Sequence, residues 1–106
     1  MPKTTVVNCK TEQYDVLIDR TTIFGNPFKV WKYGREGCIK KFETYFYNRI
    51  ERDPVWKARV IAELGGGKRL GCHCKQPDRE VSCHGDVYKD YLDAYEWLDR
   101  IKKESE

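Results

Sequence analysis

The chain has 106 residues, of which 35% are charged and 40% hydrophobic, and its net charge of +3 comes from 20 basic and 17 acidic side chains. This length fits one domain with a single modest core, and the 13% of aromatic residues argues against disorder. The positive charge permits contact with a phosphate or an acidic partner, but it is too weak to favour a dedicated nucleic-acid binder.

The sequence shows no sign of export or of membrane insertion. Its start lacks the apolar segment of a signal peptide, and no run approaches the roughly 18 apolar residues of a membrane span. Five cysteines is an odd number, and without an export signal a disulfide framework is not expected. We therefore expect reduced thiols, a cytoplasmic protein and no membrane partner; the oligomeric state cannot be read from the sequence.

Two short strands are predicted near the start of the chain. Thr4–Cys9 is rich in β-branched residues, and Tyr14–Asp19 is a second apolar run of strand length. A loop follows, in which Gly25-Asn26-Pro27 has turn chemistry. Phe28–Trp31 is interpreted as a short extended segment or edge strand.

Two helices and a third strand are predicted next. The first helix covers roughly 35–52, with one apolar side formed by Ile39, Phe42, Phe46 and Ile50. Asp53-Pro54 begins a second helix, because Asp is a favoured N-cap and Pro suits the first helical position. That helix is expected to end near Leu64, before three glycines, and 68–72 is the third strand candidate.

A last helix is predicted from about Ser82 to Lys102. Its expected buried side recurs at intervals of three and four and consists of Val87, Tyr91, Ala94, Leu98 and Ile101. The order strand, strand, helix, helix, strand, helix predicts a single α/β domain over residues 1–106, Rossmann-like, with a small sheet of three or more strands packed by about three helices.

Three cysteines and both histidines lie together between the third strand and the last helix. These residues are Cys72, His73, Cys74, Cys83 and His84. Sulfur and imidazole groups bind soft metals and act as nucleophiles or proton carriers near neutral pH. A strand end joined to a helix N-terminus is also the usual functional edge of an α/β fold. The cluster therefore indicates a site.

Three interpretations of this site stay open. The favoured one is a ligand-binding or reactive pocket, in which Cys83, His84 and Asp86 are the catalytic candidates and no metal is required. A second is a zinc site formed by Cys72, Cys74, Cys83 and His84 (or Asp86), although the spacing is not that of a paired zinc knuckle. The third is that Cys72 and Cys74 are small buried residues beside a capped helix.

The other cysteines are interpreted as packing residues. Cys9 lies in a strand and Cys38 on a helix, each apart from the cluster. Cys83, at a helix N-terminus beside His84, is expected to react with iodoacetamide faster than either of them.

A second candidate element is the loop after the second strand. Arg20 presents a rigid donor fork suited to phosphate or carboxylate, and Asn26 offers both a donor and an acceptor. We expect both to lie on the same sheet edge as Cys74 and His84; the alternative is a tight turn beside a solvated charge. The basic and aromatic run Lys40–Tyr47 is interpreted as a helix with a core face, not as a stacking platform for bases.

Five blocks of the chain together resemble domain-of-unknown-function family 4326, a group of small phage and bacterial proteins. The blocks are 6–8, 14–20, 24–28, 67–74 and 83–87. The chain departs from the family pattern at Asp19, Phe24 and His73. It matches the pattern at Arg20, Asn26, Cys72, Cys74, Cys83, His84 and Asp86. The resemblance implies that loop 20–28 and the Cys-His block are parts of one site, and it is compatible with a phage protein in the host cytoplasm.

The expected function is binding, with modification or sequestration, of a nucleotide- or nucleoside-like ligand in a cleft at the strand ends. Arg20 and the last helix would meet its anionic groups, Asn26 would contact a polar edge, and Cys72 and Cys74 would complete the binding surface. The sequence does not decide whether the protein is an enzyme. The alternative is a zinc-stabilised interaction module that contacts nucleic acid or a host protein; nucleic acid is not the favoured partner.

Overall fold

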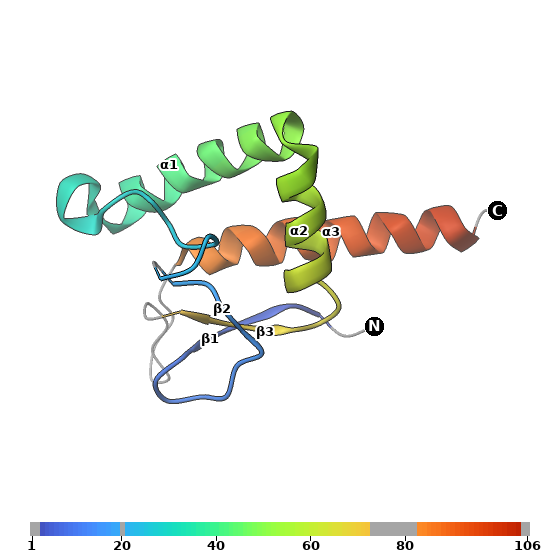
Figure 1. Ribbon diagram of the computed structural model, residues 1–106, viewed down its shortest axis with the longest axis horizontal. Coiled ribbons are helices and arrows are strands. Elements are labelled where there is room, and N and C mark those ends of the chain that lie inside the picture. Colours follow the sequence, from blue (N-terminus) through green and yellow to red (C-terminus); the bar gives the residue numbers. More distant parts are fainter. Residues whose placement is uncertain (1–2, 20, 73–82, 105–106) are drawn as a thin grey trace.

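The computed structural model describes residues 3–19, 21–72 and 83–104 of the chain. Within these ranges it contains β1 (Thr5–Asn8), β2 (Val16–Leu17), α1 (Val30–Arg52), α2 (Pro54–Leu64), β3 (Arg69–Cys72) and α3 (His84–Glu104) (Figure 1). The predicted α/β class is confirmed: a small sheet of three parallel strands packs with three helices in one compact domain.

The sheet has β3 at its centre, in the order β1-β3-β2, and both pairings are parallel. Asn8 is opposite Cys72, and Leu17 is opposite Gly71, so the three strands end at one edge. The predicted strand 14–19 is shorter than expected. Only its middle is paired as a strand, although the Ile18 N–H still donates to the Gly71 carbonyl at 2.9 Å.

Helix α3 lies nearest to the sheet, and α1 and α2 pack on the same side of it (Figure 1). Tyr88 of α3 lies at the centre of the core and is fully buried. Its ring centre is 5.5 Å from that of Phe42, 5.1 Å from that of Phe46 and 6.4 Å from that of Trp56. One aromatic side chain therefore joins α3 to both other helices, with the edge-to-face and tilted contacts that aromatic pairs favour.

Helix α1 begins earlier than predicted, and the expected extended segment Phe28–Trp31 is wrong, because Val30 and Trp31 are already helical. The helix is kinked at Gly34, whose φ of +72° lies in the left-handed region that favours glycine. The predicted start, Arg35, is the first residue after this kink. The predicted apolar side is confirmed: Phe42 and Phe46 are fully buried, and Ile39 and Ile50 pack against the core.

Helix α2 has the predicted bounds and the predicted cap. The Asp53 carboxylate accepts a hydrogen bond from the Trp56 N–H at 3.0 Å, and Pro54 is the first helical residue. Gly66 and Gly67 follow the helix with positive φ values of +85° and +79°. The chain then reverses into β3 without a side chain to strain the turn.

The buried side of α3 differs from the prediction. The helix begins at His84, and Ser82 lies outside the described residues. Its buried residues are His84, Gly85, Val87, Tyr88 and Leu92. Of the predicted set, Val87 is buried and Tyr91 partly buried, whereas Ala94, Leu98 and Ile101 are exposed.

The last apolar residues of α3 are exposed because the helix is longer than the core against which it packs. The C-terminal half of α3 extends past α2 and the sheet (Figure 1). Helical periodicity therefore identified an apolar side that continues beyond the part of the chain that could bury it. Among the described residues, no helix is both long and apolar enough to cross a bilayer.

Two leucines on α3 test this description. Leu92→Ala should lower the free energy of unfolding by about 2–5 kcal/mol, because Leu92 is fully buried and its loss leaves a cavity. Leu98→Ala should change it by no more than about 0.5 kcal/mol, since Leu98 is 55% exposed. Urea unfolding followed by circular dichroism measures both. Equal losses would show that the end of α3 is covered in solution.

Candidate functional site

The carboxyl edge of the sheet brings together three residues that the sequence singled out. Cys72 ends β3, and its Sγ lies 3.0 Å from Sγ of Cys83, directly before α3. His84, the first residue of α3, places Nε2 2.7 Å from the carbonyl oxygen of Ile18, which follows β2. Strand ends and a helix N-terminus thus meet here, as the α/β arrangement predicts.

The hydrogen bond to Ile18 shows which nitrogen of the His84 ring carries a proton. A carbonyl oxygen only accepts, so Nε2 must be the protonated nitrogen. In the neutral ring Nδ1 is then an acceptor, and it lies 3.7 Å from Sγ of Cys83. Phe42 holds the ring from another side, with an edge-to-face contact at 5.3 Å between ring centres. The imidazole is therefore oriented with its basic nitrogen toward a thiol.

Cys83 is enclosed by protein. Cys83 is 1% exposed. Its Sγ contacts Cys72 and His84 and also accepts a hydrogen bond from the Gly85 N–H at 3.4 Å. A thiol next to an oriented imidazole is the arrangement used by cysteine nucleophiles, in which a third group, here the Ile18 carbonyl, positions the base. The pair has the chemical groups for nucleophilic or acid–base work, but Cys83 and His84 are both buried among the described residues.

Asp86 has a structural partner. Its carboxylate accepts from the Cys83 N–H at 3.1 Å, while its own N–H donates to the Cys83 carbonyl at 3.0 Å. This reciprocal pair caps the first turn of α3, and a carboxylate there also suits the helix dipole. The geometry gives Asp86 a capping role; its catalytic role stays a prediction.

Asn26 organises the turn before α1. Its Oδ1 accepts from the Phe28 N–H at 2.9 Å, and its Nδ2 donates to Sγ of Cys38 at 3.0 Å. The Cys38 thiol in turn lies 3.0 Å from the Phe28 carbonyl, to which it donates. Asn26 is 9% exposed, so its polar groups are used within the protein, and its ligand-binding role stays a prediction. Cys38 is buried as expected, but it also holds this turn through two hydrogen bonds.

Tyr88 joins this loop to the site. Its hydroxyl group was not singled out from the sequence. Its hydroxyl donates to the Phe24 carbonyl at 2.9 Å, and burial raises its pKa far above the ordinary value, so the hydroxyl stays protonated. Its position one helical turn after His84 was a usable signal. The sequence carries no comparable signal for the Ile18 carbonyl, because every residue has a backbone carbonyl group.

Two predicted ligand-binding residues, Arg20 and Cys74, lie outside the described residues, as does His73. The expected proximity of Arg20 and Asn26 to Cys74 and His84 is therefore not tested in full. Across residues 3–19, 21–72 and 83–104, no group of three or more His, Cys, Asp and Glu side chains could hold a metal ion. The zinc hypothesis therefore depends on Cys74.

Because Gly85 has no side chain, α3 can approach the strands closely. Adding a methyl group at this position tests how close the two are. A Cβ at this position would lie 2.7 Å from a Val6 methyl and 3.0 Å from Cδ1 of Ile18. Gly85→Ala should therefore destabilise the protein by about 1–3 kcal/mol. Gly37→Ala is the matched control, since its Cβ would meet only Tyr33 at 3.6 Å, and it should gain about 0.5–1 kcal/mol from helix propensity. Two variants of equal stability in urea would contradict the close approach.

The burial of the thiols predicts a different order of labelling from the one that the sequence suggests. Cys38, Cys72 and Cys83 are buried, whereas Cys9 is intermediate. In folded protein, Cys9 should react with iodoacetamide before those three, because alkylation needs access as well as thiolate. Peptide mass mapping at successive times reports each cysteine, and labelling in urea, where the order should vanish, is the control. If Cys83 reacts first in folded protein, the site opens in solution and the original expectation holds.

Comparison with known proteins agrees with the resemblance seen in the sequence. The family model described as "Domain of unknown function (DUF4326)" matches residues 3–94. The chain is also 38% identical over 82 residues to the "Uncharacterized 12.4 kDa protein in nrdA-td intergenic region" of Enterobacteria phage T4, covering 77% of this chain and 70% of the phage protein. No solved structure matches. Because the family model matches residues 3–94, which are most of the chain, the chain belongs to the DUF4326 family.

Proposed function

We propose that this protein binds a nucleotide- or nucleoside-like ligand at the carboxyl edge of its sheet. The observation that supports the proposal most directly is the meeting of three strand ends with the start of α3 beside Cys83 and His84. In parallel α/β sheets, ligands bind outside the carboxyl ends of the strands, and helix N-termini attract their anionic groups. Nucleotides combine such groups with polar base edges.

The residues divide the work in this proposal. The buried Cys72, Cys83 and His84 form the floor of the edge, where they position α3 against the strands. Arg20, assigned from the sequence, supplies the charge for a phosphate. Cys83 and His84 are the groups that would act chemically on a bound ligand. Mass analysis of the nucleotide after incubation separates modification, which changes its mass, from sequestration, which does not.

A thermal-shift panel of nucleosides, nucleotides and ADP-ribose derivatives tests the proposal. A binding ligand should raise the melting temperature, since free ligand at 100 times its Kd stabilises the folded state by about 2.7 kcal/mol. Arg20→Gln should lower the affinity for that ligand by about tenfold or more, as expected for the loss of a charge-assisted hydrogen bond. Arg59→Gln is the matched control and should leave binding unchanged, because Arg59 pairs with Glu63 on α2, at 2.7 Å.

Two outcomes would count against the proposal. If no compound in the panel stabilises the protein at millimolar concentration, the edge does not hold a nucleotide. The alternative, a zinc-stabilised interaction module, gives a different result in elemental analysis of the same sample. Stoichiometric zinc, with unfolding on chelation, would establish that alternative, and a metal-free folded protein would exclude it.

A further inference from the structure

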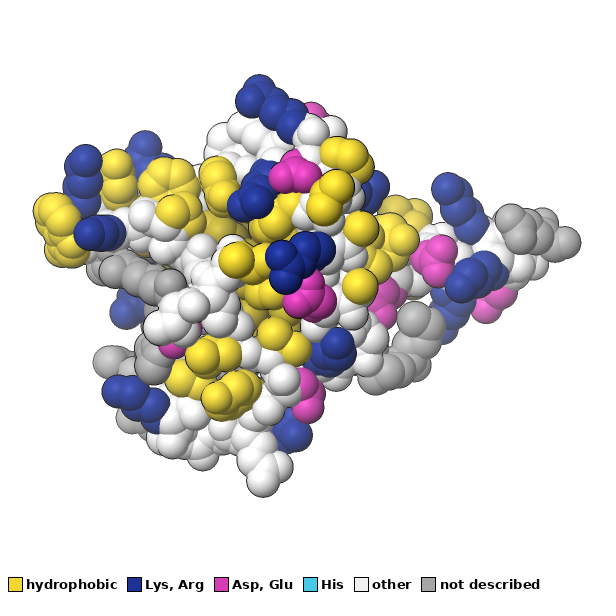
Figure 2. Space-filling model, in the orientation of Figure 1, with side chains coloured by type: hydrophobic (Ala, Val, Ile, Leu, Met, Phe, Trp, Pro, Cys, Tyr) yellow, Lys and Arg dark blue, Asp and Glu magenta, His cyan; other side chains and the backbone are white. Residues whose placement is uncertain are grey.

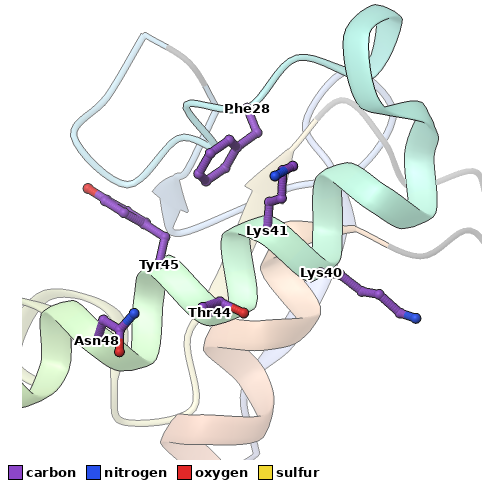
Figure 3. Close-up of a pocket in the computed structure, with 6 residues that line it drawn as sticks. All are labelled: Phe28, Lys40, Lys41, Thr44, Tyr45 and Asn48. Carbon is purple, nitrogen blue, oxygen red and sulfur yellow. The ribbon is translucent and has the colours of Figure 1, made fainter.

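A hollow lies between α1 and the end of the loop that precedes it. It has a volume of about 410 Å³ and is lined by Phe28, Lys40, Lys41, Thr44, Tyr45 and Asn48. Phe28, Lys41 and Tyr45 face one another across it, whereas Lys40 extends outward (Figure 3). Phe42 and Phe46 of the same helix point into the core. The run Lys40–Tyr47 thus has the predicted core face and, in addition, a polar and aromatic outer face.

The positive charge of the protein is concentrated beside this hollow. Residues 28–41 contain five basic side chains and one acidic one, a net charge of +4, so the +3 of the whole chain leaves −1 for all other residues. Figure 2 shows dark blue side chains among yellow ones at the N-terminal end of α1. The mild net charge therefore conceals one strongly basic segment, and such a segment attracts polyanions.

Aromatic rings extend the hollow along the same segment. The Phe28 ring centre lies 6.0 Å from those of both Tyr33 and Tyr45, and Nζ of Lys41 lies 4.8 Å from the centre of the Tyr33 ring. In the first turn of α1, Trp31 is 79% exposed, with Nζ of Lys29 5.9 Å from its ring. An indole this exposed contributes little to folding, but it offers an open face for stacking.

We propose that this surface, formed by residues 28–48, binds single-stranded nucleic acid. Such proteins combine cations, which follow the phosphate backbone, with aromatic rings, which stack on unpaired bases. On this surface the exposed ring of Trp31 is the stacking candidate, and the half-buried rings of Phe28, Tyr33 and Tyr45 support the cations beside it. A duplex hides the faces of its bases, and an acidic peptide needs the cations but not the rings. Thr44 and Asn48 add hydrogen-bonding groups that suit phosphate, sugar or base edges. The inference concerns a different surface from the proposed nucleotide site and does not depend on it.

Fluorescence anisotropy with a labelled oligothymidylate and the full chain tests the lysines. The double substitution Lys40→Gln, Lys41→Gln should weaken binding and reduce the slope of log affinity against log salt by about 1.4, because each lost phosphate contact in a single strand accounts for about 0.7. The matched control is Lys102→Gln, Lys103→Gln. It removes the same charge from an adjacent, exposed lysine pair on another helix and should leave the slope unchanged.

Trp31 provides an optical test of stacking. In a Trp97→Phe background the remaining indoles are Trp31, which is exposed, and Trp56, which is 3% exposed. Oligothymidylate should then quench the emission of Trp31. Trp31→Ala should lower the affinity for oligothymidylate by at least about fivefold. Circular dichroism checks that this variant is folded, as expected for a residue so exposed.

Several results would overturn the inference. One is equal binding by the two lysine double variants. A second is binding of a duplex, or of polyglutamate, as tightly as the single strand, because charge alone would then explain the attraction. A third is unchanged Trp31 emission at saturating oligothymidylate. A nucleotide that binds with Lys40 and Lys41 replaced, but not with Arg20 replaced, would support the sheet-edge site separately.

Discussion

The structure depends on the contact between the first turn of α3 and the strand ends. His84 donates to the carbonyl of Ile18 at 2.7 Å, and Gly85 leaves room for Val6 and Ile18 to touch the helix backbone. One turn later Tyr88 enters the centre of the aromatic core and donates to the Phe24 carbonyl. A single helical turn thus fixes the sheet, the loop after β2 and the other two helices.

Burying an imidazole and two thiols at this contact needs a reason, because a buried polar group is costly unless it is hydrogen-bonded. The bond to Ile18 satisfies Nε2 of His84 and joins the start of α3 to the end of β2. It leaves Nδ1, which faces the Cys83 thiol at 3.7 Å. A purely structural lock would not need a thiol at that position, since a small apolar residue would fill the space. The pairing of thiol and basic nitrogen is therefore the feature on which the proposed chemistry depends.

The elements could largely be predicted from local patterns. The Asp53-Pro54 cap, the Phe42 and Phe46 side of α1 and the meeting of Cys72, Cys83 and His84 followed from residue types and spacing. The failures concern what lies beyond a local pattern. The apolar side of α3 continues past the core, so its last apolar residues are exposed. Trp31, which was expected in an extended segment, lies in a helical turn before the Gly34 kink. Likewise, the partners of Asn26 are a thiol and a backbone group 12 and 2 residues away, and no sequence spacing announces such contacts.

The loop between β2 and α1 connects the two proposed binding surfaces. At one end the Phe24 carbonyl accepts from Tyr88 of α3, beside the sheet edge; at the other end Phe28 lines the hollow on α1. Between them Asn26 and Cys38 hold the backbone of Phe28 through two hydrogen bonds of 2.9 and 3.0 Å, and a third, of 3.0 Å, joins their own side chains. These anchors are buried, so they strongly constrain the position of Phe28 relative to His84. The two surfaces differ in charge. The described groups at the edge are thiols, an imidazole and a capping carboxylate, whereas residues 28–41, which lead into α1, carry a net charge of +4. In the two proposals, a polyanion is therefore attracted over long range toward α1, whereas a ligand at the edge depends on short-range contacts and on the charge assigned to Arg20.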